Sequence, residues 1–303
     1  MKKLRIIQIM LLMVLGAGAN AQQIPQHSQF MFNDFLVNPA ITGTKDYFQA
    51  ISNNRYKWIG VVDAPRTYVL SVYGPHRSKN MGFGGYIFND VTGPTTRSGI
   101  NLSYGYQFQL TSDIKLSLGL AAGLLQYKID ATKIDFHDPE VVIGDNMYTD
   151  YLPDGNAGVY MYGSNYFFGI AGNQLFNNRV KLDGSRSDSQ MQLKTHLNVI
   201  GGYRFPISDA FAIEPSVQLK YILSTSIYQA ELNARFIYDE DIWAGISYRH
   251  DDAVSVLVGY EILDQIFIGY SYDISTTKLI DYSTGTHELM IGAKFNKLKQ
   301  DSE

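Results

Sequence analysis

The sequence predicts an all-β protein: a transmembrane antiparallel β-barrel of about 14 strands with an N-terminal plug or docking segment. Three observations predict this fold. Long segments alternate apolar and polar residues, an export signal precedes them, and no later stretch is apolar enough for a spanning helix. The content of 22 Tyr and 16 Phe also suits a barrel with aromatic girdles at both membrane interfaces.

The amino-terminal residues have the parts of a secretory signal peptide, assigned to 1–21. The positive residues Lys2, Lys3 and Arg5 precede an apolar run over 6–15, and small residues at 19–21 suit cleavage. The mature chain is expected to begin near Gln22. Because the chain contains no cysteine, a lipid anchor, disulfides and thiolate metal sites are excluded. The expected localisation is the outer membrane.

Charge argues against nucleic acid as a partner. The formal net charge is −4, and no basic run follows the signal. The expected partners are outer-membrane lipid and other proteins.

The clearest strand pattern lies in residues 99–110 and has a strict period of two. The apolar positions are Ile100, Leu102, Tyr104, Tyr106, Phe108 and Leu110, and the polar or small ones are Asn101, Ser103, Gly105, Gln107 and Gln109. After the polar turn 111–113, alternation resumes from Ile114 to Leu124. These segments predict a hairpin of two long strands.

The same pattern continues along the chain, and Pro215 predicts a bulge or a break because it cannot donate a ladder hydrogen bond. Strands are predicted at 47–53, 66–73, 82–89, 99–110, 114–126, 156–163, 166–174, 196–205, 211–223, 227–237, 242–249, 253–262, 266–274 and 287–295. The predicted barrel spans 47–296 and leaves a tail at 297–303.

Connection lengths give a second test, because bacterial barrels alternate short periplasmic turns with longer outer loops. Counted from the first strand, every second connection should be short, and those at 111–113, 164–165, 239–241 and 263–265 are. The long connections at 128–155, 175–195 and 275–286 fall on the alternate positions, which should be outer loops. Two further outer connections, 224–226 and 250–252, are short. The pattern therefore supports a barrel with both termini in the periplasm, but imperfectly.

A soluble β-sandwich or propeller would also alternate, and three features favour the barrel. The polar face is rich in Gly, Ser, Asn and Gln rather than long charged side chains. The apolar face of 114–124 has no Lys or Arg, each of which would cost roughly 2–4 kcal/mol at the bilayer midplane. Tyrosines recur at row ends, at Tyr221, Tyr238, Tyr248 and Tyr260.

Residues that could carry chemistry are dispersed, so neither an enzyme nor a cofactor is expected. The six histidines lack a metal-binding spacing: His27, His76, His137, His196, His250 and His287. The glycines at 82, 84 and 85 lack the features of a phosphate loop. Carboxylates crowd one long loop, where calcium binding is a weak alternative to ordinary solvation: Asp135, Asp138, Glu140 and Asp145.

Several early motifs carry a family resemblance. They are Gln23–Asn33 with Asn38, Pro39, Ala40 and Gly43; Trp58–Gly60 with Ala64–Thr67, Gly74 and Pro75; and Asn89, Asp90, Gly93, Pro94 and Arg97. Together they resemble the start of the mature PorP/SprF family of type IX secretion system membrane proteins of Bacteroidetes. The likeness covers the mature chain, with its specific motifs before about residue 130.

The resemblance implies a non-enzymatic outer-membrane component of the secretion and gliding machinery. Its implied partners are other type IX secretion components and a secreted surface adhesin with a type B C-terminal sorting domain. Segment 22–46 is expected to be a lumenal plug or a periplasmic docking element. The partner-binding or plug candidates are Gln29, Phe30, Met31, Phe32, Asn33, Asn38, Pro39, Gly43, Trp58, Arg66, Asn89, Asp90, Gly93 and Pro94. The alternatives are a porin or solute channel and, less favoured, a surface enzyme.

Overall fold

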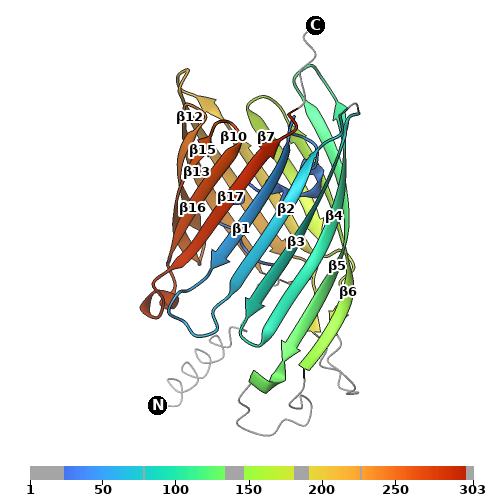
Figure 1. The fold of residues 1–303 in the computed structure, drawn as a ribbon, viewed down its shortest axis with the longest axis vertical. Coiled ribbons are helices and arrows are strands. Elements are labelled where there is room, and N and C mark those ends of the chain that lie inside the picture. The colour runs from blue at the N-terminus through green and yellow to red at the C-terminus, as the bar shows by residue number, and fades with distance from the viewer. Residues whose placement is uncertain (1–23, 78, 134–146, 181–190, 226, 298–303) are drawn as a thin grey trace, which may run out of the picture.

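The computed structural model describes residues 24–77, 79–133, 147–180, 191–225 and 227–297. Its main feature is a closed antiparallel barrel of fourteen strands (Figure 1). These strands are β1 (Phe48–Tyr56), β2 (Arg66–Pro75), β3 (Met81–Thr92), β4 (Thr95–Gln109), β5 (Lys115–Asp130), β6 (Met147–Tyr162), β7 (Tyr166–Asn173), β10 (His196–Tyr203), β12 (Phe211–Ile222), β13 (Tyr228–Tyr238), β14 (Ile242–Arg249), β15 (Ala253–Ile262), β16 (Ile266–Ser275) and β17 (Thr286–Phe295).

Each strand pairs with its neighbour in the chain, and β1 pairs with β17 to close the barrel. The short strand β11 (Phe205–Pro206) continues the course of β10 beside β12, while β8 (Arg179–Val180) and β9 (Met191–Gln192) form a separate hairpin. Short 3-10 helices are η1 (Asp34–Leu36), η2 (Pro39–Ile41), η3 (Ala131–Lys133) and η4 (Lys278–Asp281). Among the described residues, no helix is long and apolar enough to cross a membrane.

The predicted alternation is confirmed by which side chains are exposed. On β4, Leu102 is 65% exposed on the outer surface, whereas the next residue, Ser103, is 6% exposed. On the neighbouring β5, Leu120 is 66% exposed. Since an exposed apolar belt is stable only in contact with lipid, the barrel exterior suits a membrane.

All fourteen strands were predicted, but the first half of β6 was wrongly assigned to a loop. Strand β6 starts at Met147, and Pro153 pairs with Leu124 of β5. On its other side, β7 pairs only with residues 157–162. Residues 147–156 are therefore an edge extension, where a proline is tolerated because one side needs no ladder.

Pro215 also lies within a strand, and the predicted interruption affects only one neighbour. Pairing of β12 with β13 continues through Pro215. On the other side of β12, the ladder with β10 ends where Ser216 pairs with Gly202. Pairing resumes with β11, where Ile213 pairs with Phe205. Because both pairs have the same register, this is a break rather than a bulge.

Candidate functional site

Residues 24–46 lie inside the barrel and run from one mouth to the other. Ile24 shares a small cavity with Ile222 and Tyr228, which flank the connection between β12 and β13 at the long-loop end. At the opposite end, Lys45 lies 3.8 Å from Asp34, shortly before β1 begins at Phe48. We call residues 24–46 the inner segment.

The first half of the inner segment is bound by buried charged side chains. The Ser28 hydroxyl accepts hydrogen bonds from Arg55 (2.7 Å) and Arg249 (2.8 Å) and donates to Asp273 (2.8 Å). The Ser28 backbone N–H donates to Glu288 at 3.0 Å. Two residues earlier, the Gln26 amide donates to Glu231 at 2.8 Å.

These charges are also paired across the wall. Arg55 bridges Asp273 at 2.6 Å and Glu288 at 2.8 Å, and Arg249 bridges Glu231 at 2.9 Å. We call these five wall residues the ionic cluster; all are at most 2% exposed. Buried ions require such partners because desolvation costs several kcal/mol per unpaired charge. The paired charges of the wall thus hold Ser28 in place through hydrogen bonds.

The ionic cluster corrects the expectation that the polar face lacks long charges. The inner row of β14 reads Trp243, Gly245, Ser247, Arg249, and that of β16 reads Phe267, Gly269, Ser271, Asp273. Both rows run from an aromatic residue at the short-turn end to a charge at the long-loop end. This repeated order was readable in the sequence, because a lone charge at the end of a small-residue row marks a functional position within a membrane.

Two charged groups in the connections lie beside the ionic cluster. Burial lowers the pKa of Lys57 to about 8, and Arg55 adds to this effect while Asp252 opposes it. Burial alone would raise the pKa of Asp252, but Arg249 and Lys57 outweigh it and hold that pKa below its usual value. Asp252 therefore stays ionised and accepts a 2.9 Å hydrogen bond from Arg249.

The second half of the inner segment packs against glycines. An added Cβ on Gly119 of β5 would lie 2.1 Å from the Ala40 nitrogen, and one on Gly105 would lie 2.3 Å from the Thr42 oxygen. The Asn38 amide donates to the Val159 carbonyl at 3.0 Å. Small residues on β4, β5 and β6 therefore leave the space that η2 fills.

Eight of the predicted candidates lie together in the inner segment. Gln29 donates to the Glu288 carbonyl, Phe30 is buried, Met31 and Phe32 line a cavity, and Asn33 donates to Asn53 and Ser71. Asn38 contacts Val159, Pro39 begins η2, and Gly43 has a φ of +80° with Gly82 packed against it.

The other six candidates lie apart, at the long-loop ends of β1 to β4. The Trp58 backbone N–H donates to Thr286, and Arg66 is exposed at the start of β2. Asn89 accepts from Ser98, Asp90 pairs with Thr67 and Arg97, Gly93 donates to Asp63, and Pro94 accepts from Asp130. Trp58, Asn89, Asp90, Gly93 and Pro94 thus stabilise the local geometry of these connections, whereas Arg66 is an exposed surface residue.

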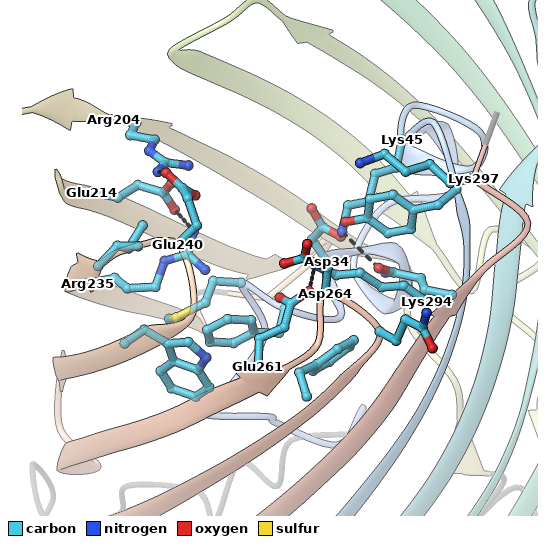
Figure 2. A pocket seen from close by; sticks show the side chains of 18 of the residues that line it. Asp34, Lys45, Arg204, Glu214, Arg235, Glu240, Glu261, Asp264, Lys294 and Lys297 are labelled. Atoms are coloured by element: carbon cyan, nitrogen blue, oxygen red, sulfur yellow. Dashed lines mark hydrogen bonds and ion pairs between the residues drawn. The ribbon is translucent and has the colours of Figure 1, made fainter. Parts of the chain in front are cut away.

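A cavity of about 950 Å³ opens at the short-turn end, and we call it the vestibule. Its apolar lining includes Met31, Phe32 and Phe167, with Trp243 4.0 Å from the Phe32 ring between centroids. Around these residues, Figure 2 shows charged side chains directed towards the cavity from both sides. They are Asp34, Lys45, Arg204, Glu214, Arg235, Glu240, Glu261, Asp264, Lys294 and Lys297.

Within the described residues, no group of three or more His, Asp or Glu side chains could hold a metal ion. The weak calcium candidates Asp135, Asp138, Glu140 and Asp145 lie outside the described residues. The calcium hypothesis therefore stays a prediction. His137 also lies outside the described residues.

A closed barrel with an apolar outer belt and a lumen filled by its own amino-terminal segment defines the class: an outer-membrane β-barrel protein. Residues 19–293 match the model of the type IX secretion system membrane protein PorP/SprF family. The chain belongs to that family.

The matches among solved structures include three outer-membrane barrels. The CymD monoaromatic hydrocarbon channel is 12% identical, with 95% of this chain and 96% of that chain covered and a TM-score of 0.49. The Pseudomonas putida toluene transporter TodX is 10% identical, with coverage of 87% and 93% and a TM-score of 0.49. A Pseudomonas aeruginosa FadL homologue is 10% identical, with coverage of 82% and 88% and a TM-score of 0.46. No significant match was found among curated protein sequences.

Proposed function

We propose that this protein is a non-enzymatic outer-membrane component of the type IX secretion and gliding machinery. It assists the secretion of an adhesin with a type B C-terminal domain and holds that adhesin at the cell surface. Family membership supports this role, because the match spans residues 19–293. The partners are then the adhesin and other type IX secretion components.

The position of the inner segment in the lumen supports a binding role rather than a channel role. Residues 24–46 make buried contacts with walls on both sides of the lumen, through Ser28 on one side and Ala40 on the other. A lumen filled in this way suits a plug, and we propose that the inner segment is one. The fixed barrel then serves as a scaffold whose ends bind partners.

Cargo capture is tested by co-purification after mild cross-linking in native membranes, with an unrelated barrel from the same membranes as control. We expect an adhesin with a C-terminal sorting domain and at least one secretion subunit to be recovered. In a strain lacking the gene, that adhesin should remain inside the cell. Recovery of neither partner, together with normal secretion in the deletion strain, would contradict the proposal.

A further inference from the structure

The vestibule combines an aromatic interior with a charged rim. Phe32 packs on Trp243, and the Arg235 guanidinium lies 4.8 Å above the Phe32 ring. Arg235 also bridges Glu214 at 2.7 Å. Nearer the mouth, Leu263 is 86% exposed on the turn between β15 and β16. The vestibule thus offers both apolar contacts and hydrogen-bonding groups to one ligand.

The rim carries no net charge. Its ten charged residues are five acidic and five basic, and they include the ion pairs Arg204–Glu240, Arg235–Glu214 and Lys294–Glu261. A site for phosphate or for an anionic lipid headgroup would instead concentrate positive charge. The ligand that matches this rim is neutral overall and carries both donors and acceptors, as a polypeptide backbone does.

Access to the vestibule is from the short-turn end. The turn residues Glu240 and Gln265 line the cavity, as does Lys297 after β17. Towards the long loops, the lumen is occupied by the inner segment and the ionic cluster. In bacterial barrels the short turns face the periplasm, so the ligand reaches the vestibule from there.

We propose that the vestibule binds a short, net-neutral polypeptide segment bearing large apolar side chains and belonging to a periplasmic protein. The proposal deepens and rests on the proposed role in secretion. A volume of about 950 Å³ exceeds what one side chain needs and is near the upper limit of roughly 300–1,000 Å³ for ligand pockets. One apolar side chain contacts Met31 and Phe32, while the peptide backbone hydrogen-bonds to the rim.

The chain itself supplies a spectroscopic reporter, because it contains only two tryptophans, Trp58 and Trp243. In a Trp58→Phe variant, all tryptophan emission comes from the vestibule. It also contains no cysteine, so single cysteines can be introduced for blocking. Gln265→Cys places a thiol at the vestibule mouth, and Ser112→Cys places one on a short turn away from the cavity.

The probe is a random octapeptide library displayed on phage and panned on the purified full-length Trp58→Phe barrel in detergent. We expect enrichment of neutral peptides with large apolar residues, and saturable changes in Trp243 emission by the synthetic peptides. Coupling a bulky maleimide to Gln265→Cys should weaken binding about tenfold or more, while the same reagent on Ser112→Cys should leave it unchanged.

Three outcomes would overturn this inference: no enrichment, enrichment of strongly charged peptides, or binding that survives the block at position 265. The assay uses neither adhesin nor secretion subunits. Peptide binding without cargo capture would therefore refute the proposed function alone, and cargo capture without peptide binding would refute the vestibule proposal alone.

Discussion

Arg249 shows how strongly a single residue couples the wall to the inner segment. It binds Ser28, Glu231, Asp252 and Asp273, and it is completely buried. Breaking a buried ion pair by removing one partner typically costs about 3–5 kcal/mol, because the remaining charges stay buried without compensation.

We predict that Arg249→Met lowers the free energy of unfolding by about 3–5 kcal/mol in urea titrations of the detergent-solubilised barrel. The matched control is Arg66→Met. Because Arg66 is exposed, its loss should change stability by about 0.5 kcal/mol or less. Similar losses in both variants would show that the ionic cluster does not stabilise the fold.

Gly119 of β5 lies on the wall that packs against η2, and a substitution there tests this contact. We predict that Gly119→Ala displaces η2, because the added Cβ would lie 2.1 Å from the Ala40 nitrogen. Amide hydrogen exchange at residues 40–42 should become faster by about tenfold or more, a loss of about 1.4 kcal/mol in local stability. Gly201→Ala is the control, since its Cβ would meet its nearest neighbour at 3.5 Å. Unchanged exchange in Gly119→Ala would mean that η2 does not depend on this gap.

At the scale of the element, we expect the inner segment to determine whether the barrel conducts ions. We predict little ionic current through the wild-type protein in planar bilayers, and large steady currents after deletion of residues 24–44. A heat-dependent gel shift identifies preparations in which the deleted form still closes as a barrel. Large currents through the wild-type protein would instead support a porin or solute channel.

Strands were predictable because each one faces two different environments. On β4, the alternation of Leu102 with Ser103 reflects lipid on one side and lumen on the other. The start of β6 was missed because Pro153 and Gly155 are turn-forming residues, and the sequence does not tell which parts of a strand have only one partner.

The candidate site was partly predictable. The family motifs identified Gln29 and Asn38, which lie in the lumen, but gave no hint of the ionic cluster. Ser28 and Asp273 are 245 positions apart, and only the closed barrel brings them together. The apolar residues Phe267 and Leu257 obscured the polar pattern of β15 and β16, because they pack in the lumenal core with Phe30 rather than facing water.

At the scale of the whole molecule, the inner segment places the first and last described residues at opposite mouths. Ile24 lies near the β12–β13 connection at the long-loop end, and Lys297 lies at the short-turn end. With short turns in the periplasm, we expect residue 24 to face the cell exterior, which differs from the sequence-based expectation that both termini are periplasmic.

We predict that Ile24→Cys reacts with a membrane-impermeant maleimide on intact cells. Lys297→Cys should react only after the outer membrane is permeabilised. Because the wild-type chain has no cysteine, it serves as the unlabelled control. The reverse labelling pattern would mean that the barrel has the opposite orientation.

The position of the inner segment also constrains biogenesis. Residues 24–46 are synthesised before any strand, yet Ser28 contacts Glu288 of β17, the last strand made. The bulky side chains of Phe30 and Phe35 are buried inside the finished wall, so late threading through a completed barrel would be sterically hindered. We therefore expect nascent strands to wrap around the earliest-made residues, with pairing of β1 and β17 as the final, enclosing event.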